Sequence, residues 1–198
     1  MKTTIFNTPI LSGIFHILAR IIMWLLGWRV DGKLPDLPKY VLIGAPHTSN
    51  WDFVLFLGLI FHLRANVHFM GKAELFRFPI GWFFRYCGGV PVDRKKSTGL
   101  VDQMVKVYNE SEKFIVTIAP EGTRHHVQEW KRGFYHIAKG AGVPIVMVVV
   151  DGKHKTAHIL KEPFYPTDDI EADMKAIKGN FEGVVGINPR RKYITLQS

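Results

Sequence analysis

Residues 46–52 read Pro-His-Thr-Ser-Asn-Trp-Asp and stand between two apolar runs, at 40–45 and 53–61. The first run has the length and composition of a buried strand, and the second continues as a helix. His47 and Asp52 therefore flank a turn from a strand end into a helix. At such a turn the carboxylate can hold one imidazole nitrogen while the other takes a proton from a hydroxyl. A single pairing is weak evidence, so the hypothesis needs support from the rest of the chain.

The composition favours one domain with a sizeable core, since the chain has 198 residues, 47% of them hydrophobic. The formal net charge of +9 suits an anionic partner, such as an acidic lipid surface, a phosphorylated substrate or nucleic acid. Nucleic acid is not expected, because aromatic-basic recognition motifs are lacking. Cys87 is the only cysteine, which excludes an intrachain disulfide and a cysteine zinc site. No metal site is expected either, since His125 and His126 have no acidic or sulfur partner at ligand spacing.

The N-terminal stretch is strongly apolar, and Ser12, His16 and Arg20 recur every four residues along one helical stripe. Arg20 would lie deep in the hydrocarbon if this helix spanned a bilayer. Trp24 and Trp28 suit the headgroup boundary instead. We therefore expect a helix that lies in the membrane interface, with a packed core helix and a true span as the alternatives.

The rest of the chain alternates strand-like and helix-like segments, which favours an α/β single domain with a mixed central sheet flanked by helices. We divide the chain into an N-terminal anchoring helix, residues 1–30, and a catalytic domain, residues 31–198. The expected strands are 40–45, 66–70, 90–92, 113–118, 144–150 and 153–160. The expected helices are 50–64, 73–86 with a bend at Pro79 and Gly81, 99–109, 131–140, and a short one toward Lys178. Asp168 and Glu171 resemble a capping box that opens this last helix.

Three further segments combine charge and glycine with a strand end. Lys72 follows one strand and opens a helix, where free backbone N–H groups can receive an anion. Arg94 follows the strand at 90–92, and an arginine can grip a phosphate with two parallel hydrogen bonds. The third segment follows the strand at 113–118 and supplies Glu121, Gly122, Thr123 and Arg124. Ligands of open α/β sheets collect outside the carboxyl ends of the strands, so these groups are candidate site residues.

Together these segments resemble the motifs of the glycerolipid acyltransferases of the PlsC type. The four blocks of that family correspond here to 47–52 (the HX4D motif), 71–76 with 89–94, 120–124, and 143–145. Each block alone would be a weak signal, whereas four blocks in order, covering roughly 40–149, are a strong one.

The resemblance implies that residues 31–198 form an acyltransferase domain active in phospholipid biosynthesis. Such an enzyme moves a fatty acyl group from coenzyme A or acyl carrier protein to the free hydroxyl of a lysophospholipid. The expected acceptor is 1-acyl-sn-glycerol 3-phosphate, and the product is phosphatidic acid. No metal or other cofactor is implied. The expected partners are membrane lipids and the two substrates, and the expected location is the cytoplasmic face of a membrane, with peripheral or monotopic attachment.

The resemblance also assigns roles to individual residues. His47 would be the general base and Asp52 the carboxylate that orients it, with direct transfer and no acyl-enzyme. Arg94 would bind the phosphate, with Lys72 and Arg124 as helpers. The remaining family positions, Glu121, Gly122 and Thr123, would shape the acceptor site.

Some positions depart from the family pattern. Pro46 precedes the histidine where many relatives have asparagine, and Ala119 stands where phenylalanine is common. The fourth block continues as Val146-Met147-Val148 without the usual second proline. These departures concern the acceptor, so another lysolipid such as a lyso-ornithine lipid stays open as the substrate. A catalytically silent lipid-binding protein is the alternative from another class.

Overall fold

The computed structural model describes residues 3–49, 51–93, 97–123, 127 and 129–188. Its strands are β1 (Arg29–Asp31), β2 (Lys39–Ala45), β3 (Val67–Lys72), β4 (Gly89–Val92), β5 (Phe114–Ile118), β6 (Ile145–Asp151) and β7 (Thr156–Ile159). Its helices are α1 (Pro9–Leu25), α2 (Trp51–His62), the 3-10 helix η1 (Ala73–Phe76), α3 (Gly81–Tyr86), α4 (Ser97–Glu110), α5 (Gly133–Ala141) and α6 (Ile170–Gly179).

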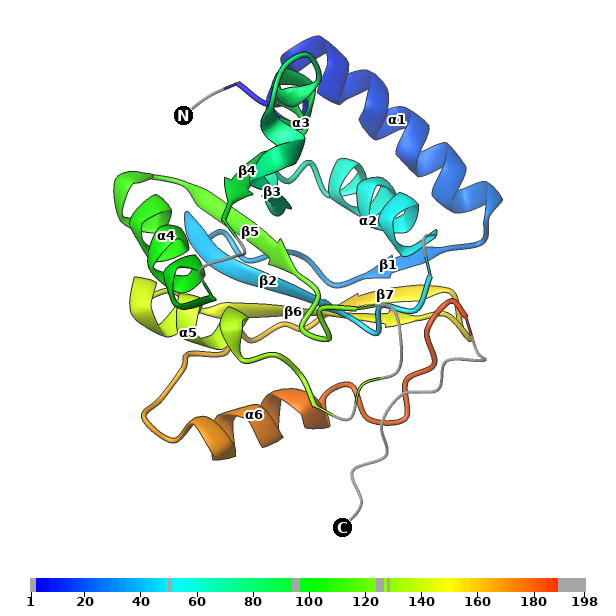
Figure 1. The fold of residues 1–198 in the computed structure, drawn as a ribbon. Coiled ribbons are helices and arrows are strands. Elements are labelled where there is room, and N and C mark those ends of the chain that lie inside the picture. The colour runs from blue at the N-terminus through cyan, green and yellow to red at the C-terminus, as the bar shows by residue number, and fades with distance from the viewer. Residues whose placement is uncertain (1–2, 50, 94–96, 124–126, 128, 189–198) are drawn as a thin grey trace.

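The described strands form one sheet in the order β1-β7-β6-β2-β5-β3-β4, shown in Figure 1. All neighbouring pairs are parallel except β6 and β7, which are antiparallel. The prediction of a single α/β domain with a mixed sheet is therefore confirmed, as are the six expected strands. The short edge strand β1 was not expected, because three residues carry too little periodicity to be recognised.

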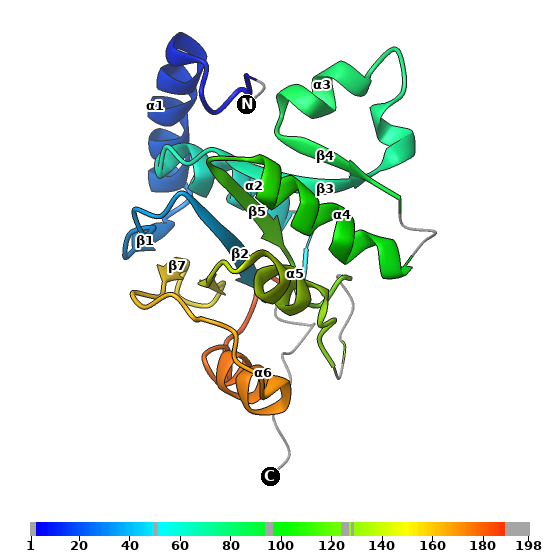
Figure 2. The same ribbon diagram turned by 90° about the vertical axis from the view of Figure 1, so that its left-hand side faces the viewer.

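Alternating side chains of the central strand β2 build two cores. Val41 and Ile43 point to the face covered by α4, α5 and α6, whereas Tyr40 and Leu42 point to the face covered by α2. Burial on both faces explains why β2 is apolar from Val41 onward and does not alternate with polar residues. Figures 1 and 2 show α1 and α2 on one side of the sheet and α4, α5 and α6 on the other.

Two helix predictions are corrected. The expected bent helix at 73–86 is two short helices, η1 and α3, because Pro79 lacks an N–H and restricts the residue before it. Helix α6 is capped by Asp169 and not by Asp168: the Asp169 carboxylate accepts the Ala172 N–H at 3.0 Å. Glu171 makes no capping box, since its carboxylate pairs with Arg132 at 2.6 Å.

Helix α1 packs against α2 through one side only. The ring of Phe15 stacks on Phe61, with 5.0 Å between centroids, and Ala19 and Met23 are buried. The opposite side of α1 is exposed and apolar, and Ile10 and Trp24 are each more than three-quarters exposed. Within the described residues, no helix is long and apolar enough to cross a membrane.

Candidate active site

The parallel register of the sheet brings together the motifs of His47 and Glu121, which lie 74 positions apart in the sequence. Strands β2 and β5 are neighbours, with Ile43 paired to Ile118, so both end at the same edge. The loop after β2 carries residues 46–49, and the loop after β5 carries 119–123. These loops meet outside the carboxyl ends of the strands, where open α/β sheets bind their ligands.

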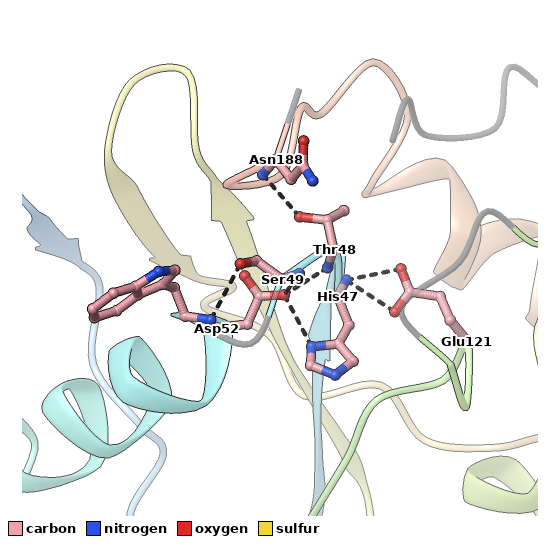
Figure 3. Close-up of polar contacts among 7 residues, drawn as sticks. His47, Thr48, Ser49, Asp52, Glu121 and Asn188 are labelled. Atoms are coloured by element: carbon pink, nitrogen blue, oxygen red, sulfur yellow. Dashed lines mark hydrogen bonds and ion pairs between the residues drawn. The ribbon is translucent and has the colours of Figure 1, made fainter. Parts of the chain in front are cut away.

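Asp52 organises the loop that carries His47, as Figure 3 shows. One carboxylate oxygen, Oδ2, lies 3.0 Å from His47 Nδ1 and also accepts the backbone N–H groups of Thr48 at 2.5 Å and Ser49 at 2.7 Å. The oxygen lies at the first turn of α2, where the helix dipole favours a negative charge. Because Nδ1 faces the carboxylate, Nε2 is the nitrogen that can exchange a proton with a substrate.

Glu121 acts on the same loop from the other side. Both of its carboxylate oxygens lie 3.0 Å from the backbone nitrogen of His47, and its side chain is buried. The contact goes to the His47 main chain, whereas the sequence suggested a role in shaping the acceptor site. The pKa of Glu121 is raised to about 7, chiefly by burial and also by the nearby charge of Asp52, against the lowering effect of the His47 N–H.

The raised pKa of Glu121 predicts a pH-dependent stability. The folded protein keeps this proton up to about pH 7, whereas the unfolded chain loses it near the ordinary pKa of 4.5. Stability must therefore fall as the pH rises between these values. In the wild type this lowers the free energy of unfolding by roughly 3 kcal/mol, at about 1.4 kcal/mol per pKa unit. We expect the Glu121→Gln variant to lack this decrease. Urea unfolding of both proteins from pH 4 to pH 8 measures the difference, and parallel curves would contradict the assignment.

The other predicted site residues are placed as follows. Gly122 and Thr123 line the cavity that contains His47. Lys72 is exposed at the end of β3 and is not among the lining residues. Arg94 and Arg124 lie outside the described residues.

Lys131 is a cavity residue that the sequence did not reveal. It lines the same cavity as His47, and its aliphatic chain crosses Gly122 so closely that a Cβ there would lie 2.8 Å from Lys131 Cδ. Gly122 also has φ of +66°, which favours glycine. Nothing in the spacing of Lys131 marks it, because it lies in a segment expected to be the start of a helix, whereas α5 begins at Gly133.

The segment before the C-terminus packs on the back of the His47 loop, which the sequence also did not reveal. The Asn188 N–H donates to the Thr48 hydroxyl at 3.1 Å, and the Gly152 N–H donates to the Val185 carbonyl at 2.7 Å. A Cβ on Gly186 would lie 2.6 Å from Thr48 Oγ1, so only glycine fits. Together with Asp52 and Glu121, this contact fixes the loop from three directions (Figure 3).

An apolar cavity of about 810 Å³ opens from His47 and runs between α2 and the sheet. Its walls include Leu55, Phe56 and Leu59 of α2 and Leu42 and Val148 of the sheet. A volume of this size, lined mainly by hydrocarbon beside a few polar groups, suits a ligand with a long apolar part.

Comparison with known proteins agrees with this geometry. Residues 29–151, well over half of the chain, match the model of the family described as Acyltransferase. The chain belongs to the acyltransferase family. The resemblance to acyltransferases of the PlsC type is confirmed, and the matched region contains the His47 loop, the Glu121 loop and most of the sheet.

Named relatives have similar sequences. A 1-acyl-sn-glycerol-3-phosphate acyltransferase of Streptococcus pneumoniae is 32% identical over 149 residues, which are 70% of this chain and 54% of the relative. The protein of that name from Escherichia coli is 30% identical over 135 residues, 64% of this chain and 54% of the relative. The chain thus spans little more than half the length of these curated relatives.

A solved structure supports the fold. The crystal structure of the 1-acyl-sn-glycerophosphate acyltransferase PlsC from Thermotoga maritima superposes with a TM-score of 0.61 and covers 87% of this chain and 77% of the other. Its sequence is 20% identical, so the likeness concerns the arrangement of helices and strands.

Proposed function

We propose that this protein transfers a fatty acyl group from an acyl thioester to the free hydroxyl of a lysophospholipid. The proposed acceptor is 1-acyl-sn-glycerol 3-phosphate, and the product is phosphatidic acid. The observation that carries the proposal is the 3.0 Å contact between His47 Nδ1 and Asp52 Oδ2 beside a long apolar cavity. Membership of the acyltransferase family and the names of the relatives support it.

In the proposed reaction, His47 Nε2 takes the proton of the acceptor hydroxyl while its oxygen attacks the thioester carbonyl. Asp52 stabilises the imidazolium that forms. The tetrahedral intermediate then expels the thiolate, which recovers the proton from His47. A thiol pKa of about 8.5 makes the thiolate a good leaving group, so a strong general acid is not needed. The step uses neither a metal nor a cofactor beyond the coenzyme A or acyl carrier protein of the donor.

Direct transfer is favoured over an acyl-enzyme. Ser49 lies two residues after His47 and is the candidate nucleophile, but its Oγ accepts the Trp51 N–H at 3.2 Å at the start of α2, as a capping residue does. The backbone N–H groups of residues 47–49 all donate to the carboxyl groups of Glu121 and Asp52. The oxyanion must therefore be stabilised by donors other than these three.

Cations near the cavity supply the binding site for the phosphate in this proposal. Lys131 lines the cavity beside Gly122 and Thr123. By the family resemblance, Arg94 is the principal phosphate ligand and Lys72 and Arg124 assist it. An arginine can bind phosphate oxygens in pairs, whereas a lysine acts as a point charge.

Gly44 provides a test of where the donor chain lies. It lines the cavity under α2, and an added Cβ would meet no atom within 4 Å, so a larger side chain would occupy free volume. We expect Gly44→Leu to lower kcat/KM for long acyl donors roughly 10–100-fold, because each excluded CH₂ forfeits about 0.8 kcal/mol. Short donors should be much less affected.

The measurement is kcat/KM for a series of acyl thioesters of increasing length, with Gly44→Ala as the matched small substitution. An equal loss at all lengths, or a dependence on the acceptor chain instead of the donor chain, would show that the cavity does not hold the donor.

We also propose peripheral attachment to the cytoplasmic face of a membrane through α1. The exposed side of this helix carries large apolar residues, among them Ile10, Ile17 and Trp24. A surface of this kind suits the boundary between headgroups and acyl chains, and the net charge of +9 favours anionic lipids.

A substrate panel tests the proposed function. Purified protein is incubated with pairs of lysolipids and acyl thioesters, and products are identified by mass spectrometry. We expect phosphatidic acid from 1-acyl-sn-glycerol 3-phosphate. Preferential acylation of a lyso-ornithine lipid would replace the acceptor, and absence of product with every pair would favour a lipid-binding protein without catalysis.

A further inference from the structure

A second apolar surface, separate from α1, lies in residues 75–83, hereafter the aromatic segment. Its exposed large apolar side chains are Leu75, Phe78, Ile80, Trp82 and Phe83. Phe78 is 96% exposed and Trp82 is 68% exposed. Scattered apolar residues are normal on protein surfaces, but five large ones within nine residues mark an interaction surface.

The exposure of the aromatic segment is built into the fold. Phe76 is buried beneath it, where a Cβ on Gly71 or on Gly89 would lie 2.8 Å from the Phe76 ring. Arg85 donates to the Phe76 carbonyl at 3.0 Å, and its guanidinium lies 5.4 Å from the centre of the Phe76 ring. A Cβ on Gly81 would lie only 2.0 Å from the Phe76 carbonyl oxygen. Phe76 thus fills the space beneath the aromatic segment, and the five neighbouring apolar side chains lie at the surface.

The aromatic segment lies at the same end of the molecule as α1, and Figure 2 shows α1 and α3 on either side of that end. The chain before α1 is tied to the end of α3: the Ile5 N–H donates to the Tyr86 carbonyl at 2.8 Å, and the Thr8 and Tyr86 hydroxyls are 3.0 Å apart. A single flat partner can therefore touch α1 and the aromatic segment together.

The charges around the aromatic segment indicate the chemistry of that partner. Lys72, Arg77 and Arg85 are exposed in and beside it, and Glu74 is the acidic residue among them. Tryptophan together with arginine and lysine suits the headgroup boundary, where the rings enter the apolar layer and the cations meet phosphates. A second copy of this chain would bring the same cations face to face, so an anionic lipid surface fits better.

We propose that the aromatic segment inserts into the interface of an anionic bilayer, as a second contact beside α1. This rests on the proposed function in one respect, namely that the protein works at a lipid surface. The segment directly follows β3, whose Phe69 and Met70 line the cavity. Insertion therefore sets the cavity at the membrane, where its lipid substrate resides.

Vesicle co-sedimentation of the full chain tests the proposal, with vesicles of phosphatidylcholine containing phosphatidylglycerol. Phe78→Glu and Trp82→Glu should each lower the partition coefficient roughly tenfold or more, since each removes a large apolar side chain from the bilayer and adds a repelled charge. Tyr165→Glu is the matched control: Tyr165 is 61% exposed and precedes α6, which lies at the other end of the molecule. Its partition should equal that of the wild type.

Partition of Phe78→Glu and Trp82→Glu equal to that of Tyr165→Glu would overturn the proposal. So would a wild-type dimer in light scattering that these substitutions dissociate without changing the partition. Two further measurements separate this proposal from the proposed function. Loss of partition in Phe78→Glu but not in Ile17→Glu would retain the aromatic segment and remove the α1 anchor. Loss of partition in Phe78→Glu, measured beside a wild type that binds the vesicles but acylates no lysolipid, would retain the segment and remove the enzymatic proposal.

Discussion

Replacing His47 with alanine is expected to abolish acyl transfer, with the rate lowered at least 10²–10⁴-fold, roughly the share that a positioned general base supplies. The imidazole is the group that Asp52 holds at 3.0 Å beside the cavity, so the substitution removes the only proposed proton acceptor. The measurement is the initial rate of thiol release from the acyl thioester with saturating lysophospholipid. Binding of the lipid should persist, because the apolar cavity is unchanged.

The chain offers a matched control in a second histidine–aspartate pair. His158 Nδ1 lies 3.0 Å from Asp31 Oδ2 at the sheet edge formed by β1 and β7. His158→Ala removes an imidazole with the same contact distance and should leave the rate unchanged. Full activity of the His47→Ala protein would show that another group takes the proton.

Replacing Asp52 with asparagine is expected to lower kcat by roughly 10²–10³-fold with a smaller effect on KM. An asparagine oxygen in place of Oδ2 still accepts the N–H groups of Thr48 and Ser49, so the loop keeps its shape. The negative charge that stabilises the imidazolium is lost, and this charge matters in the transition state more than in the bound substrate. The amide NH₂ would take the place of Oδ1, which is buried and has no hydrogen-bond partner among the described residues.

Asp52→Ala separates the charge of this residue from its structural role. Alanine removes the charge and also the acceptor for two backbone N–H groups, so both activity and melting temperature should fall. Steady-state kinetics and thermal unfolding of both variants give the comparison. Equal kcat in Asp52→Asn and the wild type would leave Asp52 with a role in loop structure alone.

Sequence patterns predicted the parts of the fold that depend on local periodicity. The continuous apolar runs at β2, β5 and β6 are typical of interior strands, and the structure has them there. Short elements depend on context instead. Strand β1 is defined by its pairing with β7. Asp169 and not Asp168 caps α6, because the Asp169 carboxylate is the one that reaches the Ala172 N–H.

In the site, too, local contacts could be predicted from the sequence, whereas contacts between distant segments could not. The His47–Asp52 contact could be predicted, because both residues belong to one short turn into a helix. The contacts of Glu121 with the His47 N–H and of Lys131 with Gly122 depend on how separate loops meet at the sheet edge. Packing of Gly186 on Thr48 joins residues 138 positions apart, and no local pattern encodes it.

The most direct test of the proposed catalysis is the position of the acceptor oxygen in a structure of the protein with lysophosphatidate and a thioether analogue of the acyl donor. We predict that this oxygen lies about 3 Å from His47 Nε2, within hydrogen-bond reach, with the donor chain in the cavity under α2. An acceptor oxygen bound away from His47, or a donor chain outside the cavity, would contradict the proposed catalysis.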